Sequence, residues 1–359
     1  MTKLYLTGGY LGSGKTTAIC GACEMLIASG KRVAVISNDQ GGRLVDGSLV
    51  KQLGFSAREV TGGCFCCRFE ALETAISSLR DSDLPEYIFA ESVGSCTDIV
   101  ATVVKPLQRS YPDLSVILTV FLDARLLASA ENGQAPSHDA DLNYIFYKQP
   151  EEADLIILNK ADLLDGSDRK AAAGFVGKRF PGKPVRFQNS LQPAGLRAWL
   201  KELETMKVPS SRKSLEIDYA LYGAGEAKLG WLDEELEIYS ETGRAIESAV
   251  VLVNAIYAAV RGAGCPIGHL KFLLHEGTWQ KKISFTSLAE PQLRQTENPL
   301  RLTNLTLLIN ARVHCTAERL SEMISGAKAD VAARQPVRFR TLGAEAFSPG
   351  YPRPTHRIN

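Results

Sequence analysis

Residues 4–17, LYLTGGYLGSGKTT, carry the strongest indication of the fold of this chain. The apolar and β-branched residues at 4–8 predict a short buried strand. Residues 9–16, GYLGSGKT, then match the pattern G-x-x-x-x-G-K-[ST], and a helix is predicted from the end of this loop to about residue 29. A strand, a glycine-rich loop and a helix in this order are the context in which the pattern binds the phosphates of a nucleotide.

The loop itself supplies hydrogen-bond donors and a cation. Its glycines allow backbone N–H groups to converge on phosphate oxygens, and the N-terminus of the following helix adds partial positive charge. Lys15 would reach the β- and γ-phosphates and take part in catalysis, and the Thr16 hydroxyl would bind Mg²⁺. A chance glycine turn, the alternative, would not need strand, loop and helix in register. The predicted nucleotide-binding residues here are Gly9, Gly12, Ser13, Gly14, Lys15, Thr16 and Thr17.

Short apolar runs alternate with helical stretches through residues 1–206. Continuous apolar strands separated by helices are typical of a parallel sheet that is covered on both faces. We therefore predict an α/β fold, a P-loop NTPase parallel sheet with helices on both faces, over residues 1–206. The predicted strands are 4–8, 32–37, 58–61, 87–92, 115–123 and 154–159; helices are predicted over 69–80 and 98–109, and a polar loop over 132–143.

The pattern changes after residues 207–214, which are interpreted as a linker. Segregated strands and helices then predict a smaller C-terminal α+β domain over 215–335, followed by an extended tail over 336–359. Its predicted strands are 215–222, 231–239, 268–275, 280–288 and 305–311, with a hairpin turn at 276–278 and helices over 244–260 and 316–327.

Residues 159–162, Asn-Lys-Ala-Asp, close the predicted strand 154–159. The carboxylate of Asp162 can accept two hydrogen bonds from the N1–H and the N2 amino group of guanine. Adenine has no such donor pair, and the unpaired carboxylate would cost about 1–3 kcal/mol. The aliphatic stem of Lys160 can pack over the base. We therefore predict that Asn159, Lys160 and Asp162 bind guanine; the alternative is an ordinary turn.

Acidic residues end three of the predicted strands. Asp39 follows strand 32–37, and Glu91 lies at the end of strand 87–92. Because the carboxyl ends of parallel strands meet at one edge of a sheet, both acids are expected near the phosphate loop. Asp39 would coordinate Mg²⁺ through water or orient the attacking water, and Glu91 resembles the Walker-B acid. Either acid could instead be a turn or cap residue, and Asp123 is interpreted as the cap of the turn that follows it.

Residues 62–67, GGCFCC, place three thiols within four positions on a glycine-containing loop. Cys64, Cys66 and Cys67 can converge on one metal, and thiolates favour Zn²⁺ or Cu(I) over Mg²⁺ or Ca²⁺. Three protein ligands leave a fourth position open, which suits metal transfer. The alternatives are a redox dithiol and buried, inert cysteines. Other cysteines are interpreted as core residues (Cys20, Cys23) or carry no assignment (Cys96, Cys265, Cys315).

Composition argues against several classes of partner. The chain has 41 Lys and Arg residues and 40 Asp and Glu residues, so its net charge gives no electrostatic reason to expect nucleic acid or an anionic membrane as partner. No apolar run approaches the roughly 18 residues of a membrane span, and the N-terminus does not resemble a signal peptide. We therefore expect a cytoplasmic protein whose eight cysteines stay reduced.

Taken together, these motifs resemble the CobW-like branch of P-loop GTPases, which is related to the nickel-enzyme maturation GTPases UreG and HypB. The resemblance rests on GGYLGSGKTT, ISNDQGG, GGCFCC, ESVG at 91–94 and KQPEEADLIILNKADL at 148–163, in the family's order. The C-x-C-C motif is specific to this branch. The chain departs from the family in reading Asn38-Asp39-Gln40-Gly41-Gly42 after the second strand, which is closer to UreG and HypB, and in lacking a histidine-rich stretch.

The resemblance implies a GTP-hydrolysing metallochaperone that uses GTP/GDP and Mg²⁺ and carries Zn²⁺ or Co²⁺. It implies delivery of the metal to a client metalloprotein or a cofactor-assembly protein, slow hydrolysis without metal or client, and a monomer or a nucleotide- or metal-dependent dimer. Carried over to this chain, Lys15 and Thr16 hold phosphate and Mg²⁺, and Asp39 is the switch acid. Two other interpretations stay open: a metal sensor or storage protein with structural nucleotide, and a P-loop kinase.

Overall fold

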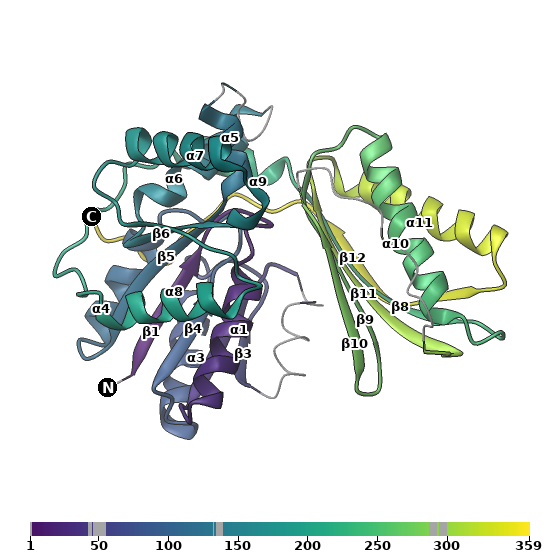
Figure 1. The fold of residues 1–359 in the computed structure, drawn as a ribbon, viewed down its shortest axis with the longest axis horizontal. Helices are drawn as coiled ribbons and strands as arrows, with labels where there is room; N and C mark the ends of the chain where they lie inside the picture. The colour runs from purple at the N-terminus through teal and green to yellow at the C-terminus, as the bar shows by residue number, and fades with distance from the viewer. Residues whose placement is uncertain are drawn as a thin grey trace. The chain divides into compact units, whose positions relative to one another are not determined.

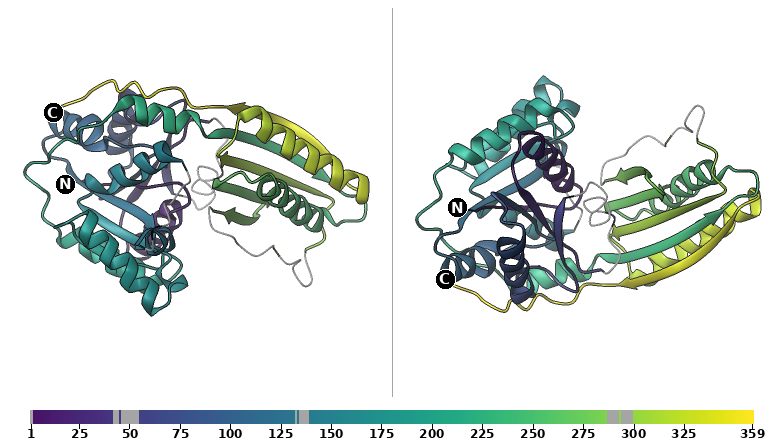
Figure 2. Two further views of the ribbon diagram at one scale, coloured as in Figure 1. Left: turned by 90° about the horizontal axis from the view of Figure 1, so that it is seen from above. Right: turned by 90° about the horizontal axis from the view of Figure 1, so that it is seen from below.

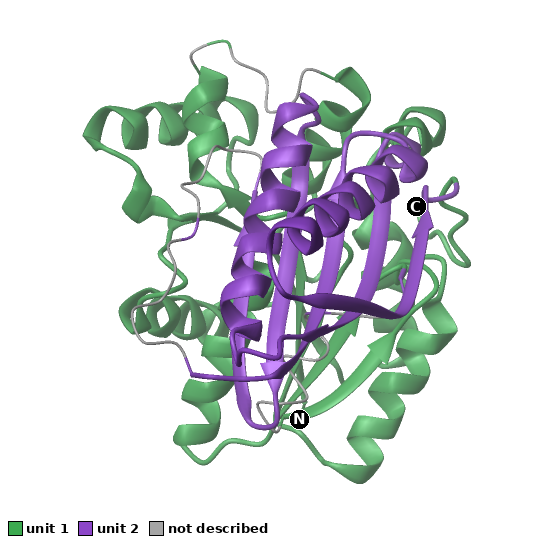
Figure 3. Ribbon diagram, turned by 90° about the vertical axis from the view of Figure 1, so that its right-hand side faces the viewer, with its two compact units in different colours: residues 1–40, 50–225, 351–359 green, residues 41–49, 226–350 purple. Residues whose placement is uncertain are grey.

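The computed structural model describes residues 2–41, 45, 55–131, 133, 139–286, 293 and 300–359. The chain forms two compact units, which Figure 3 colours separately: unit 1 comprises residues 1–40, 50–225 and 351–359, and unit 2 comprises 41–49 and 226–350. The domain boundaries expected from the sequence, residues 1–206 and 215–335, stay a prediction, because a compact unit of the structure need not be a segment that folds independently.

Unit 1 is built on a parallel sheet with the strand order β3-β2-β4-β1-β5-β6-β7. Each pair of neighbouring strands within it is parallel. The predicted α/β architecture is therefore confirmed. The strands are β1 (Lys3–Gly8), β2 (Val33–Asn38), β3 (Ser56–Val60), β4 (Tyr87–Glu91), β5 (Ser115–Asp123), β6 (Leu155–Asn159) and β7 (Val185–Phe187).

Helices cover both faces of this sheet (Figures 1 and 2). On one face, the fully buried ring of Trp199 packs edge-on against Phe121 of β5, with ring centroids 5.2 Å apart. The helices are α1 (Lys15–Ala28), α3 (Phe69–Ser82), α4 (Lys105–Ser110), α5 (Ala124–Glu131), α6 (Ala140–Glu151), α7 (Gly166–Arg179), α8 (Pro193–Thr205) and α9 (Tyr219–Ala227), with a π-helical turn η1 (Val100–Val104) before α4 and a 3₁₀ turn η2 (Ala161–Leu163).

The register of the strands brings the motifs to one edge of the sheet. Glu91 lies opposite Thr7 of β1 and Ser37 of β2, and Asn159 lies opposite Asp123. In an open parallel sheet, ligands bind outside the carboxyl ends of the strands, where the direction of the connections reverses. Here the reversal occurs around β1, which lies between β4 and β5 and leads directly into the phosphate loop.

Unit 2 is an antiparallel sheet with two long helices on one face (Figure 1). The helices bury apolar side chains against the sheet, and the predicted α+β class is confirmed. Helix α10 has the length and apolar composition of a membrane span, but 56% of it is buried, as in a core helix. The elements are β8 (Gly230–Tyr239), α10 (Ala245–Gly262), β9 (Ile267–Glu276), β10 (Trp279–Phe285), β11 (Asn304–Val313), α11 (Ala317–Arg334) and β12 (Arg338–Phe347), and the strand order is β10-β9-β11-β8-β12.

The strand predicted over 215–222 is wrong, because helix α9 begins at Tyr219. The side chain of Asp218 accepts hydrogen bonds from the N–H groups of Ala220 and Leu221, at 2.9 and 3.1 Å. A carboxylate in this position satisfies donors that a helix start leaves unpaired. The partial alternation of apolar residues before Asp218 suggested a strand, and the cap was the overlooked signal.

Residues 338–347 of the predicted extended tail form edge strand β12, which pairs antiparallel with β8. One further expectation needs correction. The predicted loop 132–143 ends earlier, since Asp139 caps α6 and the helix begins at Ala140. Residues 132 and 134–138 of that loop lie outside the described residues, as do residues 287–288 of the predicted strand 280–288.

Candidate nucleotide and metal sites

The phosphate loop has a backbone that requires glycine. Gly9, Gly12 and Gly14 have φ values of 124°, 73° and 93°. These values lie in the region that residues with a Cβ rarely adopt. At Gly9 a Cβ would also lie 2.1 Å from the carbonyl oxygen of Phe121. Among the described residues no side chain caps the N-terminus of α1, so this end of the helix fits a phosphate group.

Lys15 and Thr16 lie buried at the start of α1. The ammonium group of Lys15 donates to the carbonyl oxygens of Gly9, at 2.7 Å, and Tyr10, at 3.4 Å. The hydroxyl of Thr16 donates to Oε1 of Glu91, at 3.0 Å. The structure thus brings Glu91 to the hydroxyl expected to bind Mg²⁺, and an oxygen-only set of this kind suits that ion. Thr17 is half-buried on the same helix.

Asn159 joins the N-K-x-D motif to the phosphate loop. Its Nδ2 donates to the carbonyl oxygen of Ser13 at 2.8 Å. Its Oδ1 accepts from the N–H and the hydroxyl of Ser190, at 3.1 and 2.8 Å. Asp162 is exposed in η2. Sequence reasoning did not find Ser190, because no motif surrounds it and only the fold brings it to Asn159.

Asp123 acts as the expected cap and has a second role. Its Oδ1 accepts the N–H of Arg125 at 3.1 Å, and its Oδ2 pairs with the ammonium of Lys160 at 2.9 Å. Burial raises the pKa of Asp123, but the hydrogen bond from Arg125 and the charges of Lys160 and Arg125 outweigh burial and lower it below the usual value. A charged Asp123 therefore holds Lys160, whose backbone is left-handed with a φ of 59°.

The three motif cysteines converge. The Sγ atom of Cys64 lies 2.7 Å from that of Cys66 and 3.3 Å from that of Cys67, and the Cys66 and Cys67 sulfurs are 3.8 Å apart. Cys64 and Cys66 are buried, and Cys67 is half-buried. All three ligand atoms lie within 4.8 Å of one another, and this soft, three-sulfur arrangement fits a zinc-like ion.

The cluster divides its protons unequally. Hydrogen bonds with Cys66 and then Cys67 lower the pKa of Cys64 well below its usual value. The hydrogen bond with Cys64 raises the pKa of Cys66, and the same partner raises the pKa of Cys67 to about 11. Of the three thiols, Cys64 therefore loses its proton most readily, and Cys66 and Cys67 retain theirs more strongly. The thiolate is the form of cysteine that binds metal.

Asn38, which the sequence analysis overlooked, holds the cysteine loop in place. Its Nδ2 donates to the carbonyl oxygens of Val60 and Gly63, at 2.9 and 2.8 Å, and its Oδ1 accepts the N–H of Phe65 at 2.9 Å. The next residue is Asp39, whose own N–H donates to the carbonyl oxygen of Val60 at 3.2 Å. The end of β2 therefore contacts the cysteine loop, residues 62–67, and directly precedes the candidate switch acid. In the sequence, the asparagine directly before Asp39 was the feature that could have indicated this contact.

Cys96, to which the sequence analysis assigned no role, also lies at the cluster. Its side chain is a hydrogen-bond partner of Cys64 and Cys66, and it is 2% exposed. The carbonyl group of Cys96 accepts a hydrogen bond from Nε2 of Gln149 at 2.8 Å. Cys96 lies five residues after Glu91, so the segment that follows β4 extends from the phosphate loop to the thiols.

Comparison with known proteins identifies the family. A family profile described as the CobW/HypB/UreG nucleotide-binding domain matches residues 3–184. The zinc chaperone CobW of Sinorhizobium sp is 30% identical over 202 residues, which are 50% of this chain and 56% of that protein. The zinc chaperone YeiR of Escherichia coli K12 is 30% identical over 168 residues, 45% of this chain and 47% of that protein.

The chain thus spans about half the length of the curated relatives that it matches. Among solved structures, HypB from Helicobacter pylori in complex with nickel aligns with 58% of this chain and 91% of that one, at 18% identity and a TM-score of 0.43. Because the family profile covers half of its residues, this chain belongs to the CobW/HypB/UreG family of nucleotide-binding proteins.

Proposed function

We propose that this protein is a GTP-hydrolysing metallochaperone that binds zinc at Cys64, Cys66 and Cys67 and delivers it to a client metalloprotein or cofactor-assembly protein. The observation that carries the proposal is the convergence of three sulfur atoms within 4.8 Å on the loop that Asn38 ties to the end of β2. The relatives named zinc chaperones favour zinc as the cargo, with cobalt as the alternative.

The nucleotide residues have separable tasks in this proposal. Lys15 would exchange the carbonyl groups of Gly9 and Tyr10 for β- and γ-phosphate oxygens. The hydroxyl of Thr16, paired with Glu91 at 3.0 Å, would hold Mg²⁺. Asp39 would orient the attacking water or a water on the ion. Without a metal or client to complete the site, turnover would be slow, about 10⁻⁴ to 10⁻² per second.

The thiol cluster would act as a transfer site. Three sulfur ligands leave the fourth position of a tetrahedral ion open to a ligand from the client. Zinc must displace the protons that Cys66 and Cys67 hold, because both thiols have raised pKa values. We therefore expect zinc affinity to increase as the pH rises. We also propose a cytoplasmic location and a monomer or a nucleotide- or metal-dependent dimer, without nucleic acid or membrane as partner.

A zinc competition titration tests the proposal. The wild type should bind about one zinc ion per chain, and Cys66→Ser should weaken binding at least about tenfold, because a hydroxyl replaces a thiolate ligand. Cys20→Ser is the matched control, since Cys20 lies buried in α1 and outside the cluster. Equal affinities of wild type and Cys66→Ser would show that these thiols do not form the zinc site.

A further inference from the structure

Residues 351–359 return from β12 to unit 1 and run alongside the cysteine loop. The N–H of Thr355 donates to the carbonyl oxygen of Cys66 at 2.9 Å. The N–H of Arg353 donates to Sγ of Cys67 at 3.2 Å. This segment therefore contacts both the backbone of the metal loop and one of its sulfur atoms.

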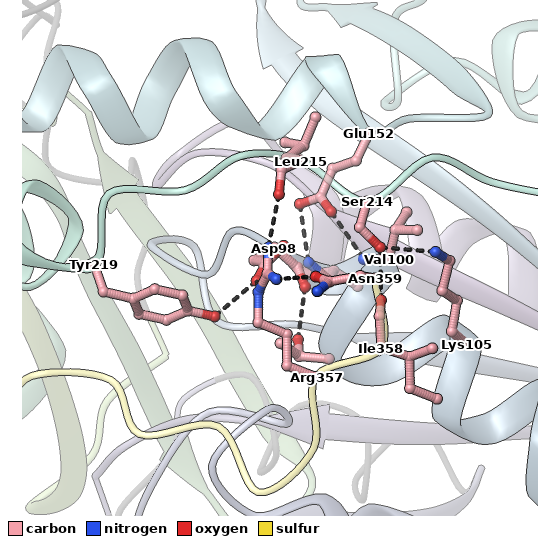
Figure 4. A network of polar contacts seen from close by, with 12 residues as sticks. Asp98, Val100, Lys105, Glu152, Ser214, Leu215, Tyr219, Arg357, Ile358 and Asn359 are labelled. Carbon is pink, nitrogen blue, oxygen red and sulfur yellow. Dashed lines mark hydrogen bonds and ion pairs between the residues drawn. The ribbon is translucent and has the colours of Figure 1, made fainter.

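The segment is anchored just beyond these contacts (Figure 4). Nε of Arg357 donates to Oδ2 of Asp98 at 2.8 Å, and the hydroxyl of Tyr219 donates to the same oxygen at 2.7 Å. The Asp98 side chain is 1% exposed. The N–H of Ile358 donates to the carbonyl oxygen of Ala101 at 2.9 Å, and Nη2 of Arg357 donates to that of Leu215 at 2.7 Å. A buried, charge-assisted anchor of this kind holds the chain in one place.

The contacted sulfur is the one that faces solvent. Cys67 is half-buried, whereas Cys64 and Cys66 are buried. An N–H hydrogen bond orients the thiolate that accepts it, and it stabilises the negative charge of that thiolate when a metal binds. Such outer contacts change metal affinity by about 10- to 100-fold when they are lost.

We propose that residues 353–357 form a strap that positions Cys67 as a metal ligand, with the N–H of Arg353 directing the sulfur and Arg357 anchoring the strap at Asp98. The proposal rests on the metal site proposed above and adds a second part of the chain to it. In this arrangement Arg353 and Arg357 are positioning residues. When the strap detaches, Cys67, the ligand nearest to solvent, binds the metal more weakly.

The test compares Arg353→Pro with Arg353→Ala in the full chain, with Co²⁺ as the probe. Proline lacks the N–H, whereas alanine keeps it, and both remove the arginine side chain. Arg353 lies between Pro352 and Pro354, and a residue before proline favours the extended backbone region, which includes the φ of proline. We expect Arg353→Pro to bind Co²⁺ about tenfold more weakly and with an altered thiolate-to-cobalt absorption band, and Arg353→Ala to match the wild type.

Arg357→Gln and Arg357→Lys test the anchor independently of backbone changes. Loss of the charge should weaken Co²⁺ binding in the same direction, and lysine should restore part of it. GDP affinity should be unchanged in every variant, which also verifies folding. If Arg353→Pro and Arg353→Ala give the same affinity and spectrum, the strap proposal is overturned while the thiol site stands. If the wild type shows no thiolate-to-cobalt band, both proposals are overturned.

Discussion

Asn38 connects the nucleotide edge of the sheet with the metal loop through a single side chain. Its amide group makes hydrogen bonds to Val60, Gly63 and Phe65, and the candidate switch acid Asp39 is its neighbour in the chain. A shift of Asp39 toward a bound nucleotide would therefore also move the loop that carries the thiols. At the residue scale, two sites that the sequence presents as separate motifs share one buried contact.

The predicted preference for guanine would depend on the carboxylate of Asp162. We expect GDP to bind at least tenfold more tightly than ADP, a difference of about 1.4 kcal/mol, because only guanine offers two donors to this group. Asp162→Ala should remove the preference and leave ADP affinity unchanged. ADP would be bound through its phosphates by phosphate-loop residues such as Ser13 and Lys15, which this substitution does not change. The measurement is calorimetric titration with each nucleotide and Mg²⁺.

Asp165→Ala provides the control for that experiment. Asp165 caps α7 by accepting the N–H groups of Ser167 and Asp168, both at 2.8 Å. Its loss should lower stability without changing the base preference. Equal affinity of the wild type for GDP and ADP would exclude a guanine-reading role for Asp162.

At the scale of elements, the C-terminal end of α6 fastens the segment between Glu91 and the thiols. Gln149 donates to the carbonyl oxygens of Gly94 and Cys96, at 3.0 and 2.8 Å. The adjoining residue Glu152 accepts the N–H groups of Ile99 and Val100, at 3.0 and 2.8 Å, where the π-helical turn begins. One helix end therefore fixes the backbone that follows β4.

Glu152 should make stability depend on pH. Burial raises its pKa from 4.5 to about 8 and outweighs the N–H donors of Val100 and Ile99, which lower it. Between about pH 4.5 and pH 8 the folded chain holds a proton that the unfolded chain has lost, so stability falls as the pH rises through this window. We expect the unfolding free energy of the wild type to fall relative to Glu152→Gln, which cannot titrate.

Denaturant unfolding of both proteins at intervals between about pH 5 and pH 8 measures this difference. Taking the difference cancels the titration of groups that the two proteins share. A difference that stays constant over the range would mean that Glu152 is ionised throughout, as an ordinary glutamate is.

At the scale of the whole molecule, nucleotide and zinc are expected to bias one conformational equilibrium. Two routes join their sites within unit 1: Asn38 beside Asp39, and the segment from Glu91 to Cys96. If both ligands act on one equilibrium, each must change the affinity of the other by the same factor. We expect a coupling of about 1–3 kcal/mol, or about 5- to 150-fold in affinity.

Zinc competition titrations of the apo, GDP-bound and GTP-analogue-bound protein measure that coupling. Titration of the nucleotide with and without zinc provides the reciprocal value, which must agree. Identical zinc affinity in the three states would show that nucleotide does not gate the cysteine loop, and the protein would then be a metal store carried by a GTPase.

Features confined to short segments were predictable from the amino-acid sequence. The phosphate loop, the N-K-x-D motif and the C-x-C-C motif each occupy a few consecutive residues, so spacing and residue type alone predict their local geometry. Continuous apolar strands between helices likewise predicted the parallel sheet of unit 1, because burial on both faces leaves a pattern in every strand.

The distant residues that complete these motifs could be identified only in the folded chain. Arg353 reaches Cys67 from 286 positions away, and Asn38 reaches Phe65 from 27 positions away. Residues 338–347 form a strand that pairs with β8, and residues 219–227 form a helix whose start is capped by Asp218. Periodicity records which side chains favour burial, but hydrogen-bond partners depend on how the chain folds back on itself, and that information is not local.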